Sequence, residues 1–327
     1  MYLNWAGQVK QALDYWGKYR VTGDFDEVVV IGMGGSGIVG DYLQLLSTLK
    51  KGIPVYTVKS HIAPSYIDEN TLVILVSYSG NTIETIKALR QVLSSRAKPV
   101  VVSSGGVLRE EALRNNLLYI PVPSGLLPRA SLPAMLYSIL GLLDSSGYTV
   151  ITREEAEKSH RFLVETTSQA NNIGVEIADW MARELGDGKL PVIATHSPLE
   201  ALAIRSKNEF NENSKIIVKV DVAPEWMHND IVGYEKPVPN GFLVLEIVDP
   251  GDSIGVKLVD FMEKIYRSYN ASIYRLNLLG ESILEKIMYG SLVAGLASVY
   301  LAERRGLDPA ETKSIHVYKR EAPSIFG

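Results

Sequence analysis

The sequence predicts an α/β protein with two doubly wound parallel-sheet sandwich domains and a C-terminal helix. Four short runs of apolar, often β-branched residues end in turn residues, and helical periodicity follows each of them. Such runs are typical of strands buried on both faces, which occur in parallel sheets joined by crossover helices. The length of 327 residues suits two domains of roughly 150 residues each.

The strand-and-helix pattern repeats in the two halves of the chain. The four strand segments lie within residues 27–37, 71–82, 190–198 and 241–253. In the first half, helices are expected at residues 38–49 and 83–93. The small, polar segment 144–149 precedes a long helical stretch, so we place the domain boundary there. Residues 1–148 are then one domain and residues 149–327 the other, and their similar rhythm indicates an old duplication.

Four helix starts carry capping residues. A serine, threonine or aspartate stands three residues before a glutamate, which is the pattern that satisfies free amides at a helix N-terminus. These starts run from Ser197 to Glu200, Thr152 to Glu155, Ser282 to Glu285 and Asp308 to Glu311. The last of them predicts that the C-terminal helix begins at Pro309.

Composition and charge exclude several classes of protein. Hydrophobic residues make up 46% and charged residues 21% of the chain, as in ordinary globular proteins and unlike disordered or fibrous ones. The formal net charge of −4 gives no basic excess, so we expect no nucleic-acid partner. Cysteine is absent, which excludes a disulfide framework and a thiolate nucleophile and favours a cytoplasmic location.

No targeting or membrane segment is predicted. The first residues show no charged start followed by an apolar run. The apolar stretch 283–301 carries Glu285 and Lys286 and small residues throughout. We therefore expect a buried core helix there and no contact with a membrane.

The glycine loop Gly32-Met-Gly-Gly-Ser-Gly37 fits the dinucleotide pattern G-x-G-x-x-G. That interpretation also requires an acidic residue at the end of the next strand, to bind a ribose hydroxyl. The next strand is expected at Val55–Val58 and is followed by Lys59 and Ser60. A nicotinamide site is therefore disfavoured, and a tight strand-to-helix turn remains the alternative.

A second loop, Ser77-Tyr-Ser-Gly-Asn-Thr82, places three hydroxyls at a strand end just before a helix. Helix N-termini offer unpaired amides and a positive dipole end to anions. We predict that Ser77, Ser79 and Thr82 bind one phosphate together with Ser36 of the glycine loop. The alternative is that Asn81 or Thr82 only caps the helix, with Glu84 completing a capping box.

The motifs MGGSG, SYSGNT, NENSK and HND occur in this order along the chain. With them the sequence resembles the sugar isomerase (SIS) superfamily, and more narrowly the bifunctional phosphoglucose/phosphomannose isomerases of archaea. The resemblance implies two SIS-type domains, a homodimer and a hexose 6-phosphate substrate, without metal or cofactor. It places the sugar phosphate on Ser36, Ser77, Ser79 and Thr82, with Gly35 as a further substrate contact.

Glu212 stands between two amides in Asn211-Glu-Asn-Ser-Lys215. Isomerisation of an aldose to a ketose needs a base near two adjacent carbons. The resemblance assigns that base to Glu212. An ion pair between Glu212 and Lys215 on an exposed helix face is the alternative, and Glu209 is the neighbouring carboxylate suited to a control.

The resemblance also assigns His228 and Arg129. His228 would open the sugar ring in the active site of the other subunit, and Arg129 would stabilise the enediolate. A buried histidine, or a metal pair with Asp230, is the alternative for His228. For Arg129 the alternative is a surface arginine in an interdomain salt bridge.

The C-terminal helix is expected to carry Thr312, His316 and Lys319 on one face, because they are spaced by four and three residues. The resemblance matches Lys319 to a lysine that assists ring opening. It matches Thr312 to the threonine associated with mannose 6-phosphate activity, and it gives His316 no role. A solvated polar face is the alternative for all three.

The sequence therefore predicts an isomerase that interconverts glucose 6-phosphate, and also mannose 6-phosphate, with fructose 6-phosphate through a cis-enediolate. An aminosugar-phosphate isomerase or deaminase with the same two domains is the nearest alternative. A sugar-phosphate sensor without catalysis is disfavoured, because the chain shows no basic DNA-reading segment. A nicotinamide oxidoreductase is the remaining alternative.

Overall fold

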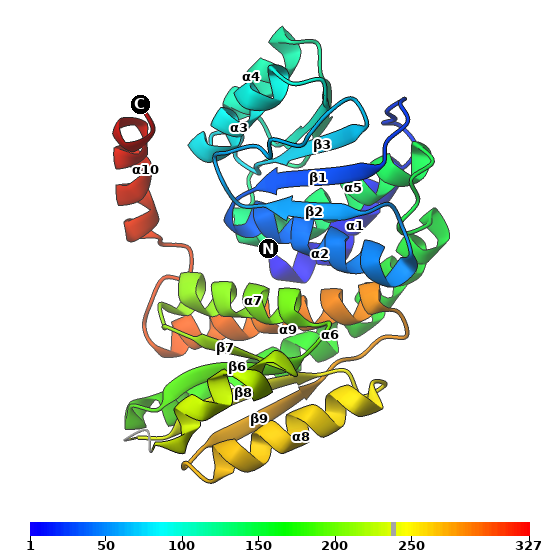
Figure 1. Ribbon diagram of the computed structural model, residues 1–327. Coiled ribbons are helices and arrows are strands. Elements are labelled where there is room, and N and C mark those ends of the chain that lie inside the picture. The colour runs from blue at the N-terminus through cyan, green and yellow to red at the C-terminus, as the bar shows by residue number, and fades with distance from the viewer. Residues whose placement is uncertain (237–239) are drawn as a thin grey trace. The chain divides into compact units, whose positions relative to one another are not determined.

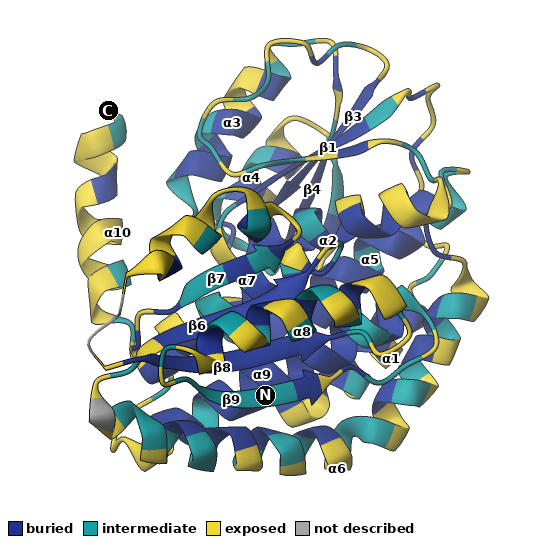
Figure 2. Cartoon of the chain, turned by 60° about the horizontal axis from the view of Figure 1, so that its bottom comes forward, coloured by how far each residue is buried: buried dark blue, intermediate teal, exposed yellow. Residues whose placement is uncertain are grey.

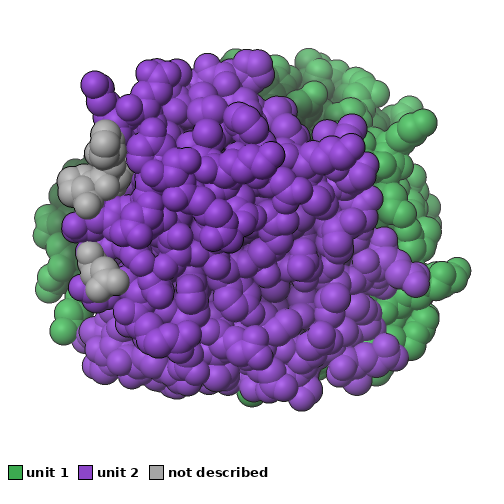
Figure 3. All heavy atoms as spheres, turned by 90° about the horizontal axis from the view of Figure 1, so that it is seen from below, with its two compact units in different colours: residues 1, 3–161, 312–327 green, residues 2, 162–311 purple. Residues whose placement is uncertain are grey.

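The computed structural model describes residues 1–236 and 240–327, and confirms the α/β fold with parallel sheets and a C-terminal helix (Figure 1). The chain forms two compact units, coloured separately in Figure 3. Unit 1 contains Met1, Leu3–Arg161 and Thr312–Gly327, and unit 2 contains Tyr2 and Phe162–Glu311. The units thus divide within the helix α6 (Arg153–Glu184), and the domain boundary after residue 148 stays a prediction.

Unit 1 has a five-stranded parallel sheet in the order β2-β1-β3-β4-β5. Its strands are β1 (Glu27–Gly32), β2 (Val55–Val58), β3 (Thr71–Val76), β4 (Lys98–Ser103) and β5 (Leu118–Pro121). Every residue of β3 is buried, as expected for a strand covered on both faces.

Helices cover both faces of this sheet (Figure 1). They are α1 (Trp5–Asp14), α2 (Gly34–Lys50), α3 (Ile83–Leu93), α4 (Gly106–Arg114) and α5 (Leu132–Ser145). The helices α3 and α4 pack their apolar residues on one face, and α1, α2 and α5 lie on the other. The C-terminal helix α10 (Lys313–Phe326) contacts α3 and is largely exposed (Figure 2).

Unit 2 has a four-stranded parallel sheet in the order β7-β6-β8-β9. Its strands are β6 (Leu190–His196), β7 (Lys219–Ala223), β8 (Phe242–Val248) and β9 (Ser272–Asn277). The longer helices of this unit besides α6 are α7 (Glu200–Glu209), α8 (Ser253–Arg267) and α9 (Ile283–Arg304).

Short helical turns complete the described part of the chain. They are η1 (Tyr2–Asn4), η2 (Pro128–Ser131), η3 (Leu185–Asp187), η4 (Phe210–Ser214), η5 (Glu225–His228) and η6 (Asp230–Glu235). Among the described helices, α9 is long and apolar enough to cross a membrane, but 78% of its most apolar window is buried inside the protein. This burial agrees with the core helix expected at residues 283–301.

Two of the four predicted caps are confirmed. Ser282 and Glu285 form a full capping box at the start of α9. Thr152 and Glu155 bond each other's amides at the start of α6, with Glu155 N donating to Thr152 Oγ1 at 3.2 Å and Thr152 N to Glu155 Oε2 at 2.9 Å. Both helices begin where the sequence pattern places them.

The other two caps are wrong. The helix α7 begins at Glu200, because Ser197 N donates to Ala223 O at 2.7 Å and Leu199 N donates to His196 O at 2.9 Å, so residues 197–199 form a separate turn. The C-terminal helix begins at Lys313 instead of Pro309, because the Asp308 carboxylate accepts from Ala310 N at 2.8 Å and forms a separate turn. The helix expected from residue 38 starts earlier, at Gly34, so three loop glycines lie in its first turn.

Candidate active site

Two loops meet at the carboxyl ends of β1 and β3. These strands are paired in parallel, with Gly32 opposite Val76, so the loops that follow them lie at the same edge of the sheet. In a sheet of order 2-1-3-4-5, the chain winds in opposite directions from these two strands, and ligands bind in the crevice between them. The helices α2 and α3 begin at these loops, at Gly34 and Ile83.

Hydrogen bonds join the predicted hydroxyl residues of the two loops. Tyr78 N donates to Ser36 Oγ at 3.0 Å, which ties the second loop to the first. The hydroxyls of Ser77 and Thr82 lie 2.9 Å apart. Ser36 and Ser77 are buried, while Ser79 and Thr82 are half-buried. The structure therefore brings these side chains onto adjoining loops of unit 1, and phosphate binding by them stays a prediction.

The capping alternative for the second loop is wrong. Thr82 is the N-cap residue of α3, but its side chain makes no cap hydrogen bond and is directed to the Ser77 hydroxyl. Glu84 does not close a capping box, since its carboxylate accepts a hydrogen bond from the Tyr318 hydroxyl. The N-terminal turn of α3 is thus available to an anion, and its dipole favours one.

A third loop fixes the conformation of the second. Gly80 has a φ of +69°, and a Cβ atom there would lie 1.8 Å from Gly105 O, so only glycine fits. Ser104 N donates to Tyr78 O at 2.8 Å, and Leu108 N donates to Gly80 O at 2.9 Å. The hydroxyl-bearing loop is therefore held by backbone bonds to the segment that follows β4.

Arg129 lies beside the glycine loop. A Cβ atom on Gly35 would be 3.0 Å from Pro128 O and 3.1 Å from Arg129 Cα, so the two backbones approach closely there. Only 4% of Arg129 is exposed, and the alternative of a surface arginine is wrong. A buried arginine therefore stands on a segment whose backbone packs against the glycine loop.

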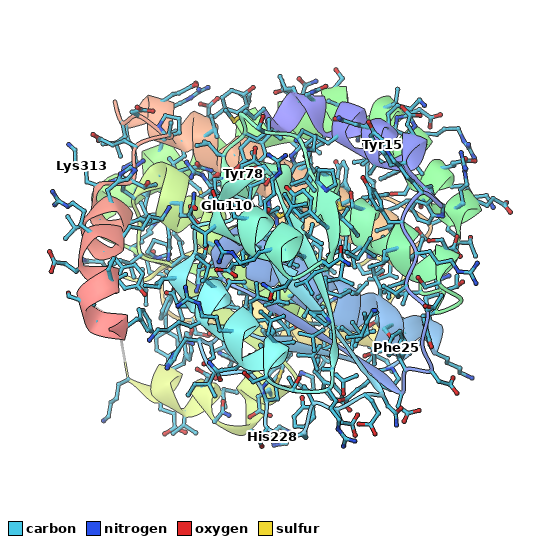
Figure 4. The ribbon with its side chains drawn as sticks, turned by 90° about the horizontal axis from the view of Figure 1, so that it is seen from above. Tyr15, Phe25, Tyr78, Glu110, His228 and Lys313 are labelled. Atoms are coloured by element: carbon cyan, nitrogen blue, oxygen red, sulfur yellow. The ribbon has the colours of Figure 1, made fainter. Side chains whose placement is uncertain are left out.

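Three further residues position the Arg129 turn, and the sequence analysis missed them. Trp5 Nε1 and Gln8 Nε2 both donate to Ala130 O, at 3.0 and 2.9 Å. Leu126 N donates to the Tyr78 hydroxyl at 2.7 Å, and burial raises the pKa of Tyr78, which is labelled in Figure 4. The sequence carries no local signal for these contacts, because the partners lie 48 to 125 residues apart.

Glu212 lies in unit 2 within the η4 segment, a single π-helical turn that follows α7. Such turns are rare and occur frequently at functional sites. Glu212 is half-buried. Lys215 Nζ donates to the carbonyl oxygens of Asn213 and Asp308 at 3.0 and 2.6 Å, which closes the turn.

His228 lies at the end of η5 in unit 2 and is exposed (Figure 4). The alternative of a buried histidine is therefore wrong. Asp230, the other half of the metal-pair alternative, forms an ion pair with Lys219 at 3.0 Å. Nearby Trp226 is fully buried against Tyr234 and Tyr266, which anchors the segment that carries His228.

Thr312 is the half-buried N-cap residue of α10, and its carbonyl oxygen accepts from His316 N at 3.1 Å. His316 and Lys319 lie within the helix and are exposed, so the spacing of four and three along the helix agrees with the shared face expected from the sequence. The Tyr318 hydroxyl donates to Glu84 in the first turn of α3, and this bond raises the pKa of Tyr318 to about 12. The helix thereby contacts the helix that begins at the hydroxyl-bearing loop, and ring opening by Lys319 stays a prediction.

The corresponding edge of the unit 2 sheet is filled by its own side chains. His196 is fully buried at the end of β6, where its Nε2 accepts from Asp249 N at 3.2 Å. Asp249 pairs with Lys286 at 2.7 Å. At the opposite edge, a cavity of about 520 Å³ is lined by the first residues of three strands, Leu190, Lys219 and Phe242. Because parallel sheets bind ligands at their carboxyl ends, we expect the phosphate at the unit 1 edge and not in this cavity.

Comparison with known proteins shows which domain family each half of the chain matches. Residues 24–138 match the SIS domain family, and residues 175–321 match the bacterial phospho-glucose isomerase C-terminal SIS domain. A solved structure with the same fold is the C-terminal domain of glucosamine-fructose-6-phosphate aminotransferase from Francisella tularensis. It superposes with a TM-score of 0.73 at 12% identity, covering 95% of this chain and 98% of that one. The chain thus has the two-SIS-domain fold of sugar-phosphate enzymes.

Proteins with similar sequences identify the enzyme family within this domain class. The bifunctional phosphoglucose/phosphomannose isomerase of Aquifex aeolicus is 34% identical over 90% of this chain and 89% of its own length. That of Thermoplasma volcanium is 31% identical over 92% of both chains. The D-glucosamine-6-phosphate 4-epimerase of Sulfolobus acidocaldarius is 30% identical over 89% of this chain and 87% of its own length. The chain belongs to the family of bifunctional phosphoglucose/phosphomannose isomerases.

Proposed function

We propose that this protein is an aldose–ketose isomerase that interconverts glucose 6-phosphate and mannose 6-phosphate with fructose 6-phosphate. The observation that carries the proposal is the pair of hydroxyl-bearing loops at the β1 and β3 ends, tied together by the bond from Tyr78 N to Ser36 Oγ. This edge offers neutral donors, two helix N-termini and a buried arginine to a phosphorylated sugar.

In the proposed mechanism, the phosphate is bound by Ser36, Ser77, Ser79 and Thr82. Binding energy from this remote group is available to orient the reacting carbons. The Glu212 carboxylate removes the proton from C2 of the open-chain aldose; the C–H electron pair forms the C1–C2 double bond of a cis-enediolate, and the C1=O double bond opens so that its electrons move to O1. The proton of O2 passes to O1, the C2=O double bond forms, and the C1–C2 double bond takes the proton back from Glu212 at C1, which gives the ketose with no electrons gained or lost overall.

The remaining predicted residues act on the enediolate, on ring opening and on rotation of the substrate. The Arg129 guanidinium stabilises the negative charge that develops on the sugar oxygen, as preorganised donors do in oxyanion sites. His228 and Lys319 transfer protons between the ring oxygen and O1 during ring opening. Thr312 leaves room for rotation about the C2–C3 bond, which mannose 6-phosphate requires.

We propose a cytoplasmic homodimer in which each subunit supplies its His228 to the other subunit's site. Two observations support this part of the proposal. His228 is exposed on unit 2, and it lies two residues after Trp226, which is fully buried and anchors the segment. The side chain of His228 is therefore accessible to another subunit.

The test is incubation with fructose 6-phosphate in the absence of added metal and nucleotide cofactor. Glucose 6-phosphate and mannose 6-phosphate are then measured separately with coupled dehydrogenases. We expect both aldoses to form. If neither forms at any enzyme concentration, the proposed function is wrong.

The similarity to a D-glucosamine-6-phosphate 4-epimerase supports a second candidate, an enzyme of aminosugar phosphates. Incubation with glucosamine 6-phosphate discriminates the two. Formation of its 4-epimer or of fructose 6-phosphate and ammonia, with no conversion of fructose 6-phosphate alone, would favour the second candidate.

A further inference from the structure

A buried polar network lies behind the π-helical turn that carries Glu212. Its centre is Glu209, the last residue of α7, with 1% of its surface exposed. Arg205 Nη2 lies 2.6 Å from Glu209 Oε1. Tyr2 is grouped with unit 2, and its hydroxyl donates to the other carboxylate oxygen, Glu209 Oε2. Burying a carboxylate this deeply requires such partners.

The network is continuous with the turn itself. Asn213 Nδ2 donates to Glu209 Oε2 at 3.0 Å and to Ser298 Oγ at 2.8 Å. Ser214 Oγ donates to Ser298 O at 2.6 Å. The two residues that follow Glu212 are therefore fixed between the end of α7 and the middle of α9, both of which belong to unit 2.

We infer that Glu209 is a positioning residue for the proposed base. Its carboxylate, held by Tyr2, anchors Asn213 and thereby sets the backbone of the turn that presents Glu212. The inference rests on the proposed function, since it concerns the residue assigned to proton transfer there. Glu209 is thus not the neutral control that the sequence suggests.

Tyr2 is held in this network by its protonation state and by its packing against α9. Burial and the neighbouring Glu209 charge raise its pKa well above 10, so the phenol keeps its proton and donates it. The helix α9 makes room for the ring with Gly295, where a Cβ atom would lie 2.4 Å from Tyr2 Cε1. An alanine at this position would therefore displace Tyr2 although it favours a helix over glycine.

The first test compares Tyr2→Phe with Tyr289→Phe. Both remove a buried phenol oxygen in unit 2, but the Tyr289 hydroxyl has no hydrogen-bond partner among the described residues. We expect Tyr2→Phe to lower kcat about tenfold, because small displacements of a catalytic group are costly, with KM for fructose 6-phosphate changed less than about twofold. Tyr289→Phe should leave both constants unchanged.

A kinetic isotope effect separates a displaced base from a loss of folded protein. With glucose 6-phosphate deuterated at C2, the primary isotope effect of Tyr2→Phe should equal or exceed that of the unmodified protein, because removal of the C2 proton is the step that slows. A smaller isotope effect, or a fall in kcat that only follows the folded fraction measured by near-ultraviolet circular dichroism, overturns the inference.

The second test uses Gly295→Ala, which keeps every network residue and displaces only the Tyr2 ring. It should reproduce the kinetic effect of Tyr2→Phe, and in a Tyr2→Ala background it should add no further loss, because the two changes act through one contact. Additive effects overturn the inference.

The failure of this inference can be told apart from the failure of the proposed function. If the unmodified protein forms no aldose, the proposed function fails together with this inference. If the unmodified protein is active and Tyr2→Phe has the same kinetic constants as Tyr289→Phe, the inference alone fails.

Discussion

At Ser36, one hydroxyl links two loops that are 42 residues apart in the sequence, by accepting the amide hydrogen of Tyr78. The neighbouring hydroxyls of Ser77 and Thr82 bond each other across a single turn. Ser36 Oγ also donates weakly to Met135 Sδ at 3.7 Å, and one hydroxyl of the Ser77–Thr82 pair donates to the other. These hydroxyl hydrogens can rotate toward a bound phosphate while Ser36 Oγ still accepts from Tyr78 N, because a hydroxyl has one donor and two acceptor sites.

Replacing both Ser77 and Ser79 by alanine should raise KM for fructose 6-phosphate at least about tenfold, because hydrogen bonds to a charged group contribute about 1.5–3 kcal/mol each. Steady-state kinetics with Ser94→Ala as the control measures this, since the Ser94 hydroxyl lies at the far end of α3 and donates to Arg90 O at 3.2 Å. An unchanged KM in the double variant places the phosphate elsewhere.

Glu212→Gln removes the proposed base and keeps its shape. Turnover should fall by about 10²–10⁴-fold, the usual contribution of a positioned base. Protection by inorganic phosphate against thermal unfolding should stay the same, because the phosphate residues are untouched. Exposed Glu200 on α7 provides the control variant Glu200→Gln, and full turnover in Glu212→Gln would remove that residue from the mechanism.

Among individual residues, the sequence predicts those whose partners are near in the chain. The spacing of Ser77, Ser79 and Thr82 places them at one strand end, and the structure does the same. Tyr2 and Trp5 could not be predicted, because their partners Glu209 and Ala130 are 207 and 125 residues away. Nothing in local composition distinguishes such an aromatic residue from an ordinary core residue.

At the scale of elements, an ionic cluster joins β8, β9 and α8 in unit 2. Arg275 bonds Glu246, Asp260 and Glu263, each at 2.7 Å. Glu246 is fully buried in the sheet, and this burial raises its pKa to about 7 despite the guanidinium beside it. Between about pH 4.5 and pH 7 the folded protein thus binds a proton at Glu246 that the unfolded chain has released.

The free energy of unfolding should therefore decrease as pH rises from about 4.5 to 7, by about 3 kcal/mol at most from this group. Glu246→Gln abolishes that titration, so its unfolding free energy should depend less on pH over this range. Urea unfolding at pH 5, 6, 7 and 8 measures the difference, with exposed Glu110→Gln on α4 as the control (Figure 4). Equal pH dependence in the two variants would show that Glu246 is ionised throughout.

The errors in element boundaries also have a physical cause. Capping patterns located the starts of α6 and α9, where the capping side chains bond the backbone amides of the first turn. At Ser197, the bond to Ala223 O and the separate turn at residues 197–199 delay the start of α7 by two residues, from Pro198 to Glu200. Tertiary hydrogen bonds of this kind override a local pattern worth about 1 kcal/mol.

At the scale of the whole molecule, the two sheets share the order of their first four strands, but different side chains lie at the carboxyl ends of their central strands. The first sheet keeps hydroxyls and helix N-termini at its switch point, whereas the second fills the matching edge with His196, Asp249 and Lys286. The duplicated strand pattern could be predicted from the sequence. Which copy carries the proposed phosphate-binding edge depends on side chains that meet only in the folded protein.

The proposed dimer makes a prediction at this scale. In a mixture of Glu212→Gln and His228→Ala chains, each mixed dimer would contain one intact site, assembled from the base of one subunit and the partner subunit's His228. After subunit exchange at equal amounts, about a quarter of the normal activity should return, because random pairing of a two-fold dimer makes half of the dimers mixed. Activity no greater than the sum of the two separate variants would contradict a shared site.

The crystal structure of the protein soaked with fructose 6-phosphate tests the central claim most directly. The account predicts that the phosphate lies within hydrogen-bond distance of the Ser77, Ser79 and Thr82 hydroxyls and that a Glu212 carboxylate oxygen lies next to C1 and C2 of the sugar. A phosphate bound away from these loops, or a Glu212 side chain turned away from those carbons, would contradict it.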